Sequence, residues 1–198
     1  QTLTIATKVY ADGHDKLAVR VRWRAAAGGE WQTVPMRELG NDSWQAELAF
    51  DSVGRHLFRI DAWIDQFASY RYELEKKFAA GVPIGLELEE GRLHLQASAE
   101  RSEDGLKAQL LSVHQRLGEL DTDAQVALLL ASDTAEAMAL ADHHAFLTRS
   151  PEYPLEVERS LAQFASWYEL FPRSITDDKA RHGTFKDVHN RLAMVRDM

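Results

Sequence analysis

Alternation between apolar and polar side chains in the first 65 residues constrains the fold of this chain more than any other feature. Residues 17–24 alternate apolar or aromatic side chains with alanine and arginine, and residues 44–50 and 56–64 repeat the pattern. A period of two is typical of a half-buried β-strand. Turn signals rich in Gly, Asn and Asp separate the stretches, at residues 11–15, 26–30, 39–43 and 51–54. The segment therefore predicts a β-sandwich.

The pattern changes at residue 65. Residues 65–81 are typical of a helix that ends at Gly81 and Pro83, and residues 85–147 predict three or four short antiparallel helices. Thr122 with Gln125, and Asp133 with Glu136, have the spacing of capping boxes that open new helices. One predicted helical face carries Leu106, Leu110, Leu111, His114, Leu117 and Leu120.

A period of two returns after residues 149–154 and predicts one long strand over residues 155–171, ended by Pro172. Such a strand can pair only with the earlier sheet, so the helices are predicted to be an insertion. The predicted fold class is α+β, an immunoglobulin- or fibronectin-like β-sandwich with an inserted small helical bundle. The sandwich takes residues 1–65 and 150–174, and the bundle takes residues 66–149. Trp23, Trp44 and Trp167 are in phase with the apolar positions and are predicted core residues.

Charge and composition exclude several classes of protein. Lys and Arg number 23 against 31 Asp and Glu, a net charge of −8, which argues against a nucleic-acid partner. No cysteine is present, which suits a reducing cytoplasm, and no apolar run is long enough to span a membrane. The chain begins with Gln1 and without a signal peptide, so we expect a cytoplasmic protein and a piece of a longer chain.

Catalytic and metal-binding motifs are not evident. The sequence holds no nucleophile elbow, P-loop or dinucleotide-binding glycine motif. Asp142, His143 and His144 are a poor metal site, because adjacent histidines on a helix point about 100° apart. We expect no metal and no cofactor.

Arginines and tryptophans supply the candidate binding residues. Arg20, Arg22 and Arg24 form a basic stripe, predicted to pair with Glu47 or Asp61 across the sheet. The alternative is an anion or partner site. Trp31 and Trp63 are out of phase with the core, so their rings could stack on sugars, although burial at an interface is the stronger explanation.

Several separate blocks resemble one known family. They are "ADGHDKLAVRVRWR" (11–24), "VPMRELGNDSWQAEL" (34–48), "AWIDQFASYRYELEKKFAAG" (62–81), "FASWYELFPRS" (164–174) and "HGTFKDVHNRL" (182–192). In this order they resemble the N-terminal region of the α-1,4-glucan:maltose-1-phosphate maltosyltransferases, a branch of the α-amylase superfamily. The resemblance covers essentially the whole chain.

The resemblance implies a β-sandwich with an inserted helical bundle, followed in the family by a (β/α)8 catalytic barrel and a C-terminal β domain. Residues 175–198 would be the linker that leads to that barrel, which is absent here. The family's nucleophile aspartate and acid/base glutamate lie in the barrel and have no counterpart in this sequence. The family is homodimeric, needs no metal or organic cofactor, and transfers maltosyl units from maltose 1-phosphate to α-1,4-glucans with retention.

We therefore expect a non-catalytic scaffold and dimerisation region, with the absent barrel and a second copy as partners. The predicted interface residues are Trp63, Tyr70, Tyr72, Trp167, Tyr168, Phe171 and Arg173. One alternative is a carbohydrate-binding module that holds the α-glucan acceptor through Arg20, Arg22, Arg24, Trp31 and Trp63. Another is the front end of an amylase-like glycoside hydrolase.

Overall fold

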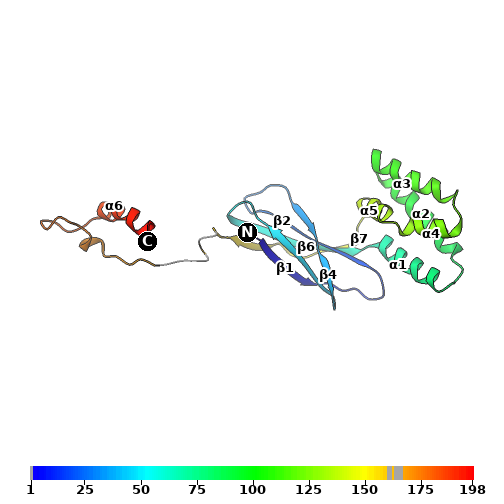
Figure 1. Cartoon of the computed structure of the whole chain (residues 1–198), viewed down its shortest axis with the longest axis horizontal. Coiled ribbons are helices and arrows are strands. Elements are labelled where there is room, and N and C mark those ends of the chain that lie inside the picture. The colour runs from blue at the N-terminus through cyan, green and yellow to red at the C-terminus, as the bar shows by residue number, and fades with distance from the viewer. Residues whose placement is uncertain (1, 160–161, 163–166) are drawn as a thin grey trace. The chain divides into compact units, whose positions relative to one another are not determined.

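The computed structural model describes residues 2–159, 162 and 167–198, and divides the chain into two compact units, Gln1–Val157 and Glu158–Met198. The first unit holds two antiparallel sheets and a helical bundle (Figure 1). Its strands are β1 (Thr2–Lys8), β2 (Leu17–Ala25), β3 (Gln32–Pro35), β4 (Arg37–Gly40), β5 (Ser43–Ala49), β6 (Gly54–Ile64), β7 (Ala145–Arg149) and β8 (Tyr153–Val157).

The two sheets share one core. A three-stranded sheet has the order β1-β5-β4, and the second sheet has the order β3-β2-β6, with β7 and β8 both paired to β6. Trp23 and Trp44 are buried in the core, as their phase in the sequence predicts. The buried core residues are Ile5, Val19, Val21, Trp23, Met36, Trp44, Ala46 and Leu48.

The hairpin between β4 and β5 follows from its two loop residues. Asn41 and Asp42 both have positive φ angles, 50° and 60°. A two-residue loop with this geometry matches the right-handed twist of the strands it joins, and Asn and Asp tolerate the left-handed region. The predicted turn at residues 39–43 is confirmed.

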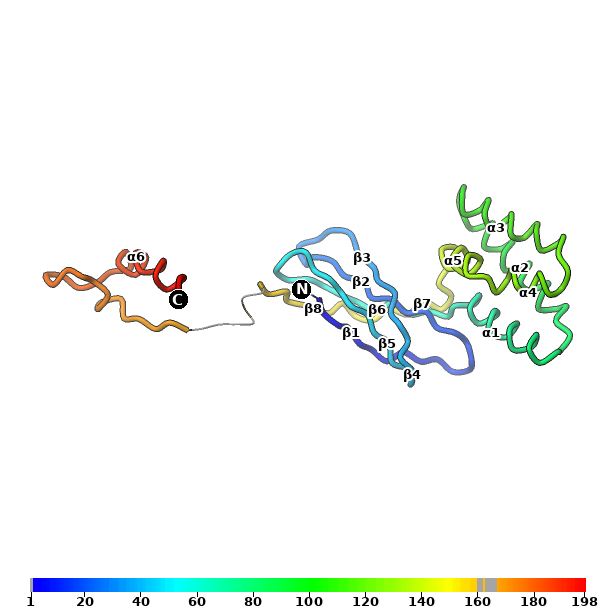
Figure 2. Tube along the Cα trace, viewed as in Figure 1, coloured from blue at the N-terminus to red at the C-terminus, as the bar shows by residue number. Residues whose placement is uncertain are grey.

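Strands β7 and β8 lie along the same edge of β6 (Figure 2). Pro151 stands between them, and it cannot donate a ladder hydrogen bond. Ser150 keeps the contact with β6 instead: its backbone N–H donates to the Ile60 carbonyl at 2.9 Å, and its Oγ accepts from the Ile60 N–H at 3.0 Å. The sheet thus resumes after the helices, at Ala145, so that the helices stand in sequence between two paired strands of one sheet.

The prediction of one strand over residues 155–171 is wrong. β8 ends at Val157, whose partner is Gly54, and β6 begins at that glycine. A longer β8 would therefore have no backbone on β6 to pair with.

The predicted burial of Trp167 is also wrong, since this side chain is 96% exposed and lies outside any strand. Residues 160–161 and 163–166 of the predicted strand lie outside the described residues. β8 also joins the sheet of β2, whereas β1 belongs to the other sheet.

The helices between β6 and β7 pack around a core of their own. They are α1 (Gln66–Ala79), α2 (Gly85–Arg101), α3 (Asp104–Leu117), α4 (Thr122–Leu130) and α5 (Ser132–Leu140). The predicted helix at 65–81 is confirmed, and so is a group of helices after residue 85. The predicted ends of this group at residue 147 and of the bundle at residue 149 are wrong, because the last helix ends at Leu140 and residues 145–149 form β7. The Leu-rich face of α3 buries Leu110, Val113 and Leu117 against the other helices. Leu111, at 44% exposure, points outward.

Side-chain caps fix where α1 and α4 begin. β6 passes directly into α1 (Figure 1). The Asp65 carboxylate accepts a hydrogen bond from the Ala68 N–H at 2.8 Å. Ser69 Oγ accepts from the Lys16 N–H at 2.7 Å and so ties α1 to the start of β2. The predicted capping box at Thr122 is wrong by one residue, because Asp121 is the N-cap of α4.

The second unit contains a short 3-10 turn (Pro172–Ser174) and α6 (Phe185–Arg196). The α6 N-terminus has a full capping box, formed by Thr184 and Asp187. Arg181 also pairs with Asp187, at 2.8 Å. Gly183 donates its N–H to the Arg173 carbonyl, and a Cβ at Gly183 would lie 2.1 Å from the Pro172 oxygen. The local fold thus depends on a glycine here. Among the helices that the structure describes, none has the length and apolar character needed to cross a membrane.

Candidate functional site

The outer face of the five-stranded sheet gathers five arginines. β2 and β6 run antiparallel, with Arg22 opposite Arg59 and Arg20 opposite Asp61. β7 then places Arg149 beside Asp61 from the other edge. The structure therefore brings the three predicted arginines together with two that sequence reasoning missed. The five are Arg20, Arg22, Arg24, Arg59 and Arg149, and we call them, with their carboxylate partners Asp61 and Glu152, the arginine face.

Asp61 lies at one end of the arginine face and is fully buried. One of its oxygens accepts from Arg20 Nε at 3.2 Å and from Arg20 Nη2 at 3.1 Å, and the other lies 3.3 Å from Arg59 Nε. The predicted pairing of the arginine stripe with Asp61 is confirmed. Pairing with Glu47 is wrong, because Glu47 lies on β5 of the other sheet, opposite Thr4.

Glu152, in the connection between β7 and β8, is the second carboxylate of the arginine face. It lies 3.7 Å from an Arg24 nitrogen and 3.8 Å from an Arg59 nitrogen, distances too long for hydrogen bonds. Arg22 has no carboxylate within 4.0 Å in the described part of the chain. Burial lowers the pKa of Arg22 from its ordinary value, and repulsion from Arg59 and Arg20 lowers it further.

Three of these guanidinium groups lie around the side chain of Trp31. Their carbons lie 4.5 Å (Arg59), 4.7 Å (Arg24) and 5.8 Å (Arg22) from the centre of a Trp31 ring. These distances are those of cation–π contacts, in which the negative face of the ring attracts the cation. Trp31 therefore holds positive charge in a small area.

Trp63 is bound into a second small cluster beside it. The Arg20 guanidinium lies 5.0 Å from the Trp63 ring, and the indole N–H donates to Asp142 Oδ2 at 2.6 Å. His144 packs edge-on at 4.3 Å, and its pKa is lowered by burial and then by Arg20. Two members of the poor metal-site candidate, Asp142 and His144, are thus engaged with Trp63.

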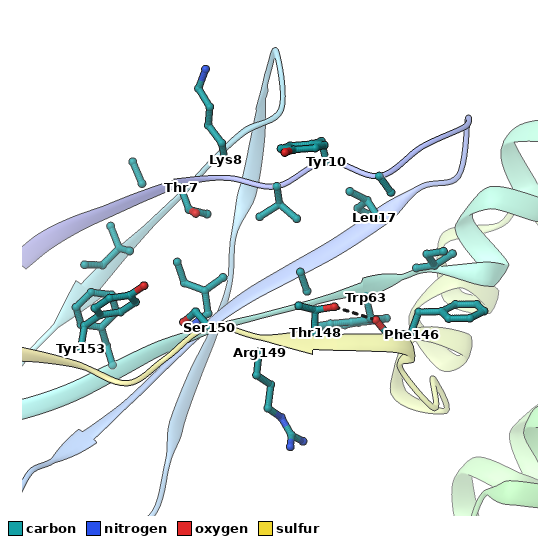
Figure 3. A pocket seen from close by; sticks show the side chains of 18 of the residues that line it. Thr7, Lys8, Tyr10, Leu17, Trp63, Phe146, Thr148, Arg149, Ser150 and Tyr153 are labelled. Atoms are coloured by element: carbon teal, nitrogen blue, oxygen red, sulfur yellow. Dashed lines mark hydrogen bonds between the residues drawn. The ribbon is translucent and has the colours of Figure 1, made fainter.

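An apolar groove of about 820 Å³ opens on the opposite, inner face of the same sheet (Figure 3). It lies between β1 and the strands β6, β7 and β8, where core side chains of β6 such as Phe58, Ile60 and Ala62 are only partly buried. Arg149 points away from the groove (Figure 3). The described side chains that line it include hydroxyls of Thr7, Thr148 and Ser150 but no Asp, Glu or His. The groove can bind by apolar contact, and its lining lacks an acid–base pair.

The predicted interface residues occupy four different environments. Tyr70 is buried in the bundle core and donates to the Glu87 carbonyl at 2.8 Å, whereas half-buried Tyr72 lies between Lys16 and Lys76 at 4.0 and 4.1 Å. Trp63 belongs to the sheet face described above. The other four are exposed and belong to the second unit: Trp167, Tyr168, Phe171 and Arg173.

Comparison with known proteins gives a consistent result. The family model described as "Alpha-1,4-glucan:maltose-1-phosphate maltosyltransferase, domain N/S" matches residues 1–159. A maltosyltransferase of that name from Pseudomonas aeruginosa is 46% identical over 99% of this chain and 30% of its own length. Relatives of the same name from Burkholderia pseudomallei and Methylacidiphilum infernorum are 42% and 35% identical, over 100% and 97% of this chain.

The chain spans less than a third of the length of these relatives, namely 30%, 18% and 29% of them. The family match covers both sheets and the helical bundle, and it includes the arginine face and the groove. The chain therefore belongs to the α-1,4-glucan:maltose-1-phosphate maltosyltransferase family, in the region described as domain N/S.

Proposed function

We propose that the chain is the non-catalytic scaffold and dimerisation region of a cytoplasmic maltosyltransferase that extends α-1,4-glucans from maltose 1-phosphate. The family match over residues 1–159 is the observation that carries this proposal. The two sheets with a shared core then correspond to an immunoglobulin-like sandwich, and the catalytic barrel would belong to the part of the relatives that this chain does not span.

The chemistry of the described residues supports a non-catalytic role. Retaining glycoside chemistry in the α-amylase manner uses two carboxyl groups about 5 to 5.5 Å apart, one as nucleophile and one as acid and base. On the arginine face, Asp61 is fully buried between arginines, and Glu152 is paired with two others. Both are thus engaged with guanidinium groups, and the described lining of the groove carries no carboxyl group.

Exposed aromatic side chains support a role in association. Trp167 is 96% exposed, Phe171 is 70% exposed, and both lie in the second unit within five residues of each other. Large apolar side chains in water favour association with another surface. A second copy of the chain and the catalytic barrel are the partners that we propose for them.

Sedimentation velocity of the 198-residue chain tests the dimerisation role. We expect a concentration-dependent dimer, and we expect the variant Trp167→Ala/Phe171→Ala to shift the equilibrium toward monomer by at least about tenfold, since two buried aromatic anchors contribute several kcal/mol. Leu86→Ala is the matched control, because this side chain is 85% exposed on α2 and should leave the equilibrium unchanged. A strictly monomeric chain would refute the role.

Binding of the glucan acceptor through Trp31 and Trp63 has less support. Guanidinium groups lie over both rings, and a pyranose would have to displace them before it could stack. Affinity electrophoresis in glycogen-containing gels tests this alternative. Retardation that disappears in Trp31→Ala and Trp63→Ala would restore it.

A further inference from the structure

The arginine face carries more positive charge than the described residues around it neutralise. Five guanidinium groups face two carboxylates, an excess of three positive charges, in a chain whose net charge is −8. Like charges at this spacing repel, and the repulsion is larger for half-buried groups than for groups in water. Such an arrangement costs stability unless a further negative charge is present.

Three of the arginines on this face also carry N–H donors that lack a hydrogen-bond acceptor. The Nε atoms of Arg22, Arg24 and Arg59 are buried, and within the described part of the chain they have no hydrogen-bond partner. The contacts of Arg24 and Arg59 with Glu152, at 3.7 and 3.8 Å, are ion pairs without hydrogen bonds. The same holds for Arg59 Nε, which lies 3.3 Å from an Asp61 oxygen without forming a hydrogen bond to it. A buried donor without an acceptor destabilises the folded chain, and the loss is larger when the donor is charged.

The three guanidinium groups converge on one ring, that of Trp31. A planar carboxylate fills one guanidinium fork, whereas a phosphate group presents three or four oxygens in different directions and carries close to two negative charges. Phosphate is therefore the oxyanion whose charge and shape suit three convergent arginines. Because the ring already holds the guanidinium groups in place, little further ordering is needed on binding.

We infer that Arg22, Arg24 and Arg59, held around Trp31, form a binding site for a phosphate group, either free phosphate or a phosphomonoester. Arg22 is the principal charge of the site, because Arg59 and Arg24 share Glu152 and Arg59 also contacts Asp61. Glu152 competes with the ligand for Arg24 and Arg59. This inference does not depend on the proposed scaffold and dimerisation role.

Isothermal titration calorimetry of the 198-residue chain, at constant ionic strength set with sodium chloride, tests the site. The probes are inorganic phosphate, glucose 1-phosphate, and maltose as a neutral control. We expect saturable binding of a phosphate-bearing probe and none of maltose. Phosphate that binds as tightly as its ester assigns the site to the free ion, and tighter binding of glucose 1-phosphate assigns it to a phosphomonoester.

Three variants make the test specific to the arginine face. Arg22→Gln should weaken binding by about tenfold or more, the usual loss when one charged hydrogen bond is removed. Glu152→Gln should tighten binding, because it removes the competing carboxylate and keeps a side chain of the same shape. Arg37→Gln, on exposed β4 of the other sheet, is the matched control and should change nothing.

Unfolding of the free variants separates a binding role from a structural one. Without phosphate, Arg22→Gln should be at least as stable as the parent chain, because it relieves repulsion from Arg59 and Arg20. The inference is overturned if no phosphate-bearing probe binds, if Arg22→Gln and Arg37→Gln weaken binding equally, or if Arg22→Gln unfolds more readily and binds phosphate unchanged. Binding of maltose in place of phosphate would overturn it as well.

Discussion

Close contact between Gly91 and Tyr70 shows how finely the helical bundle is packed. A Cβ built on Gly91 of α2 would lie 2.2 Å from the Tyr70 hydroxyl and 3.0 Å from a Leu129 methyl. The Tyr70 hydroxyl is held there by its hydrogen bond to the Glu87 carbonyl, one turn earlier on α2. The absence of a side chain at residue 91 therefore lets α1 and α2 approach each other.

Gly91→Ala should destabilise the chain, although alanine is favoured over glycine in a helix by about 1 kcal/mol. We expect a loss of about 1 to 3 kcal/mol in the free energy of unfolding, the usual cost of an overpacked core site. Urea denaturation followed by circular dichroism measures it. Gly105→Ala on α3 is the control, since a Cβ there meets nothing within 4 Å, and it should be neutral or stabilising.

The double variant Gly91→Ala/Tyr70→Phe should recover part of the loss, because removing the hydroxyl removes the closest contact. A fully additive pair, or a Gly91→Ala variant as stable as the parent, would contradict this packing.

His94 gives the bundle a pH dependence whose sign can be stated. Burial lowers its pKa, while Glu90, at 3.7 Å, acts in the opposite direction and Arg101 adds to the lowering. As the pH falls below about 6.5, this histidine is protonated in the unfolded chain while it stays neutral in the folded chain. Its contribution to the free energy of unfolding is therefore fully present above that pH and is lost progressively below it, down to the folded-state pKa. His94→Gln should flatten the dependence of unfolding free energy on pH between about pH 7 and 5. An unchanged slope would contradict this account.

At the scale of elements, alternation in the sequence predicts strand faces well and strand lengths poorly. The faces of β2, β5 and β6 follow their period of two because one side is covered and the other is not. The pattern over residues 155–171 had the same period, yet β8 stops where its partner β6 begins. The length of β8 depends on where β6 begins. The sequence of residues 155–171 does not contain that information.

The candidate site, too, is predicted only in part from the sequence. Arg20, Arg22 and Arg24 are found from one stretch of sequence, but Arg59 joins them only through the register of β2 with β6. Arg149 and Glu152 join only because the chain returns to β6 after the whole helical segment. The sequence thus identifies some of the arginines near Trp31. It does not predict that Arg59 and Glu152 lie beside them, because that depends on strand pairing between distant segments.

The N-cap of α1 is an element-scale feature with a clear test. The Asp65 carboxylate caps the helix where β6 enters the bundle, and burial raises its pKa. Asp65→Ala should lower the free energy of unfolding by about 1 kcal/mol, the usual cost of a lost cap. Asp65→Asn keeps an oxygen acceptor without a buried charge, so at pH 7 it should be as stable as the parent or more so. Equal losses in thermal denaturation of both variants would argue against the cap.

At the scale of the whole molecule, the chain combines a β framework, an interrupting helical bundle and a separate C-terminal unit. The family match covers the first two of these, over residues 1–159. Both carboxylates of the arginine face are paired with guanidinium groups, and the groove offers apolar contact without an acid or a base. Under the non-catalytic role that we propose, we expect the transferase chemistry to lie in parts of the relatives that this chain does not span.

The decisive test of the non-catalytic role is an activity assay with the purified 198-residue chain. It measures the phosphate released from maltose 1-phosphate in the presence of glycogen. We expect no release above the protein-free blank, at any pH between about 5 and 8, while the same preparation shows cooperative unfolding. Release that increases in proportion to the amount of chain added would contradict it, and would require a catalytic pair among these residues.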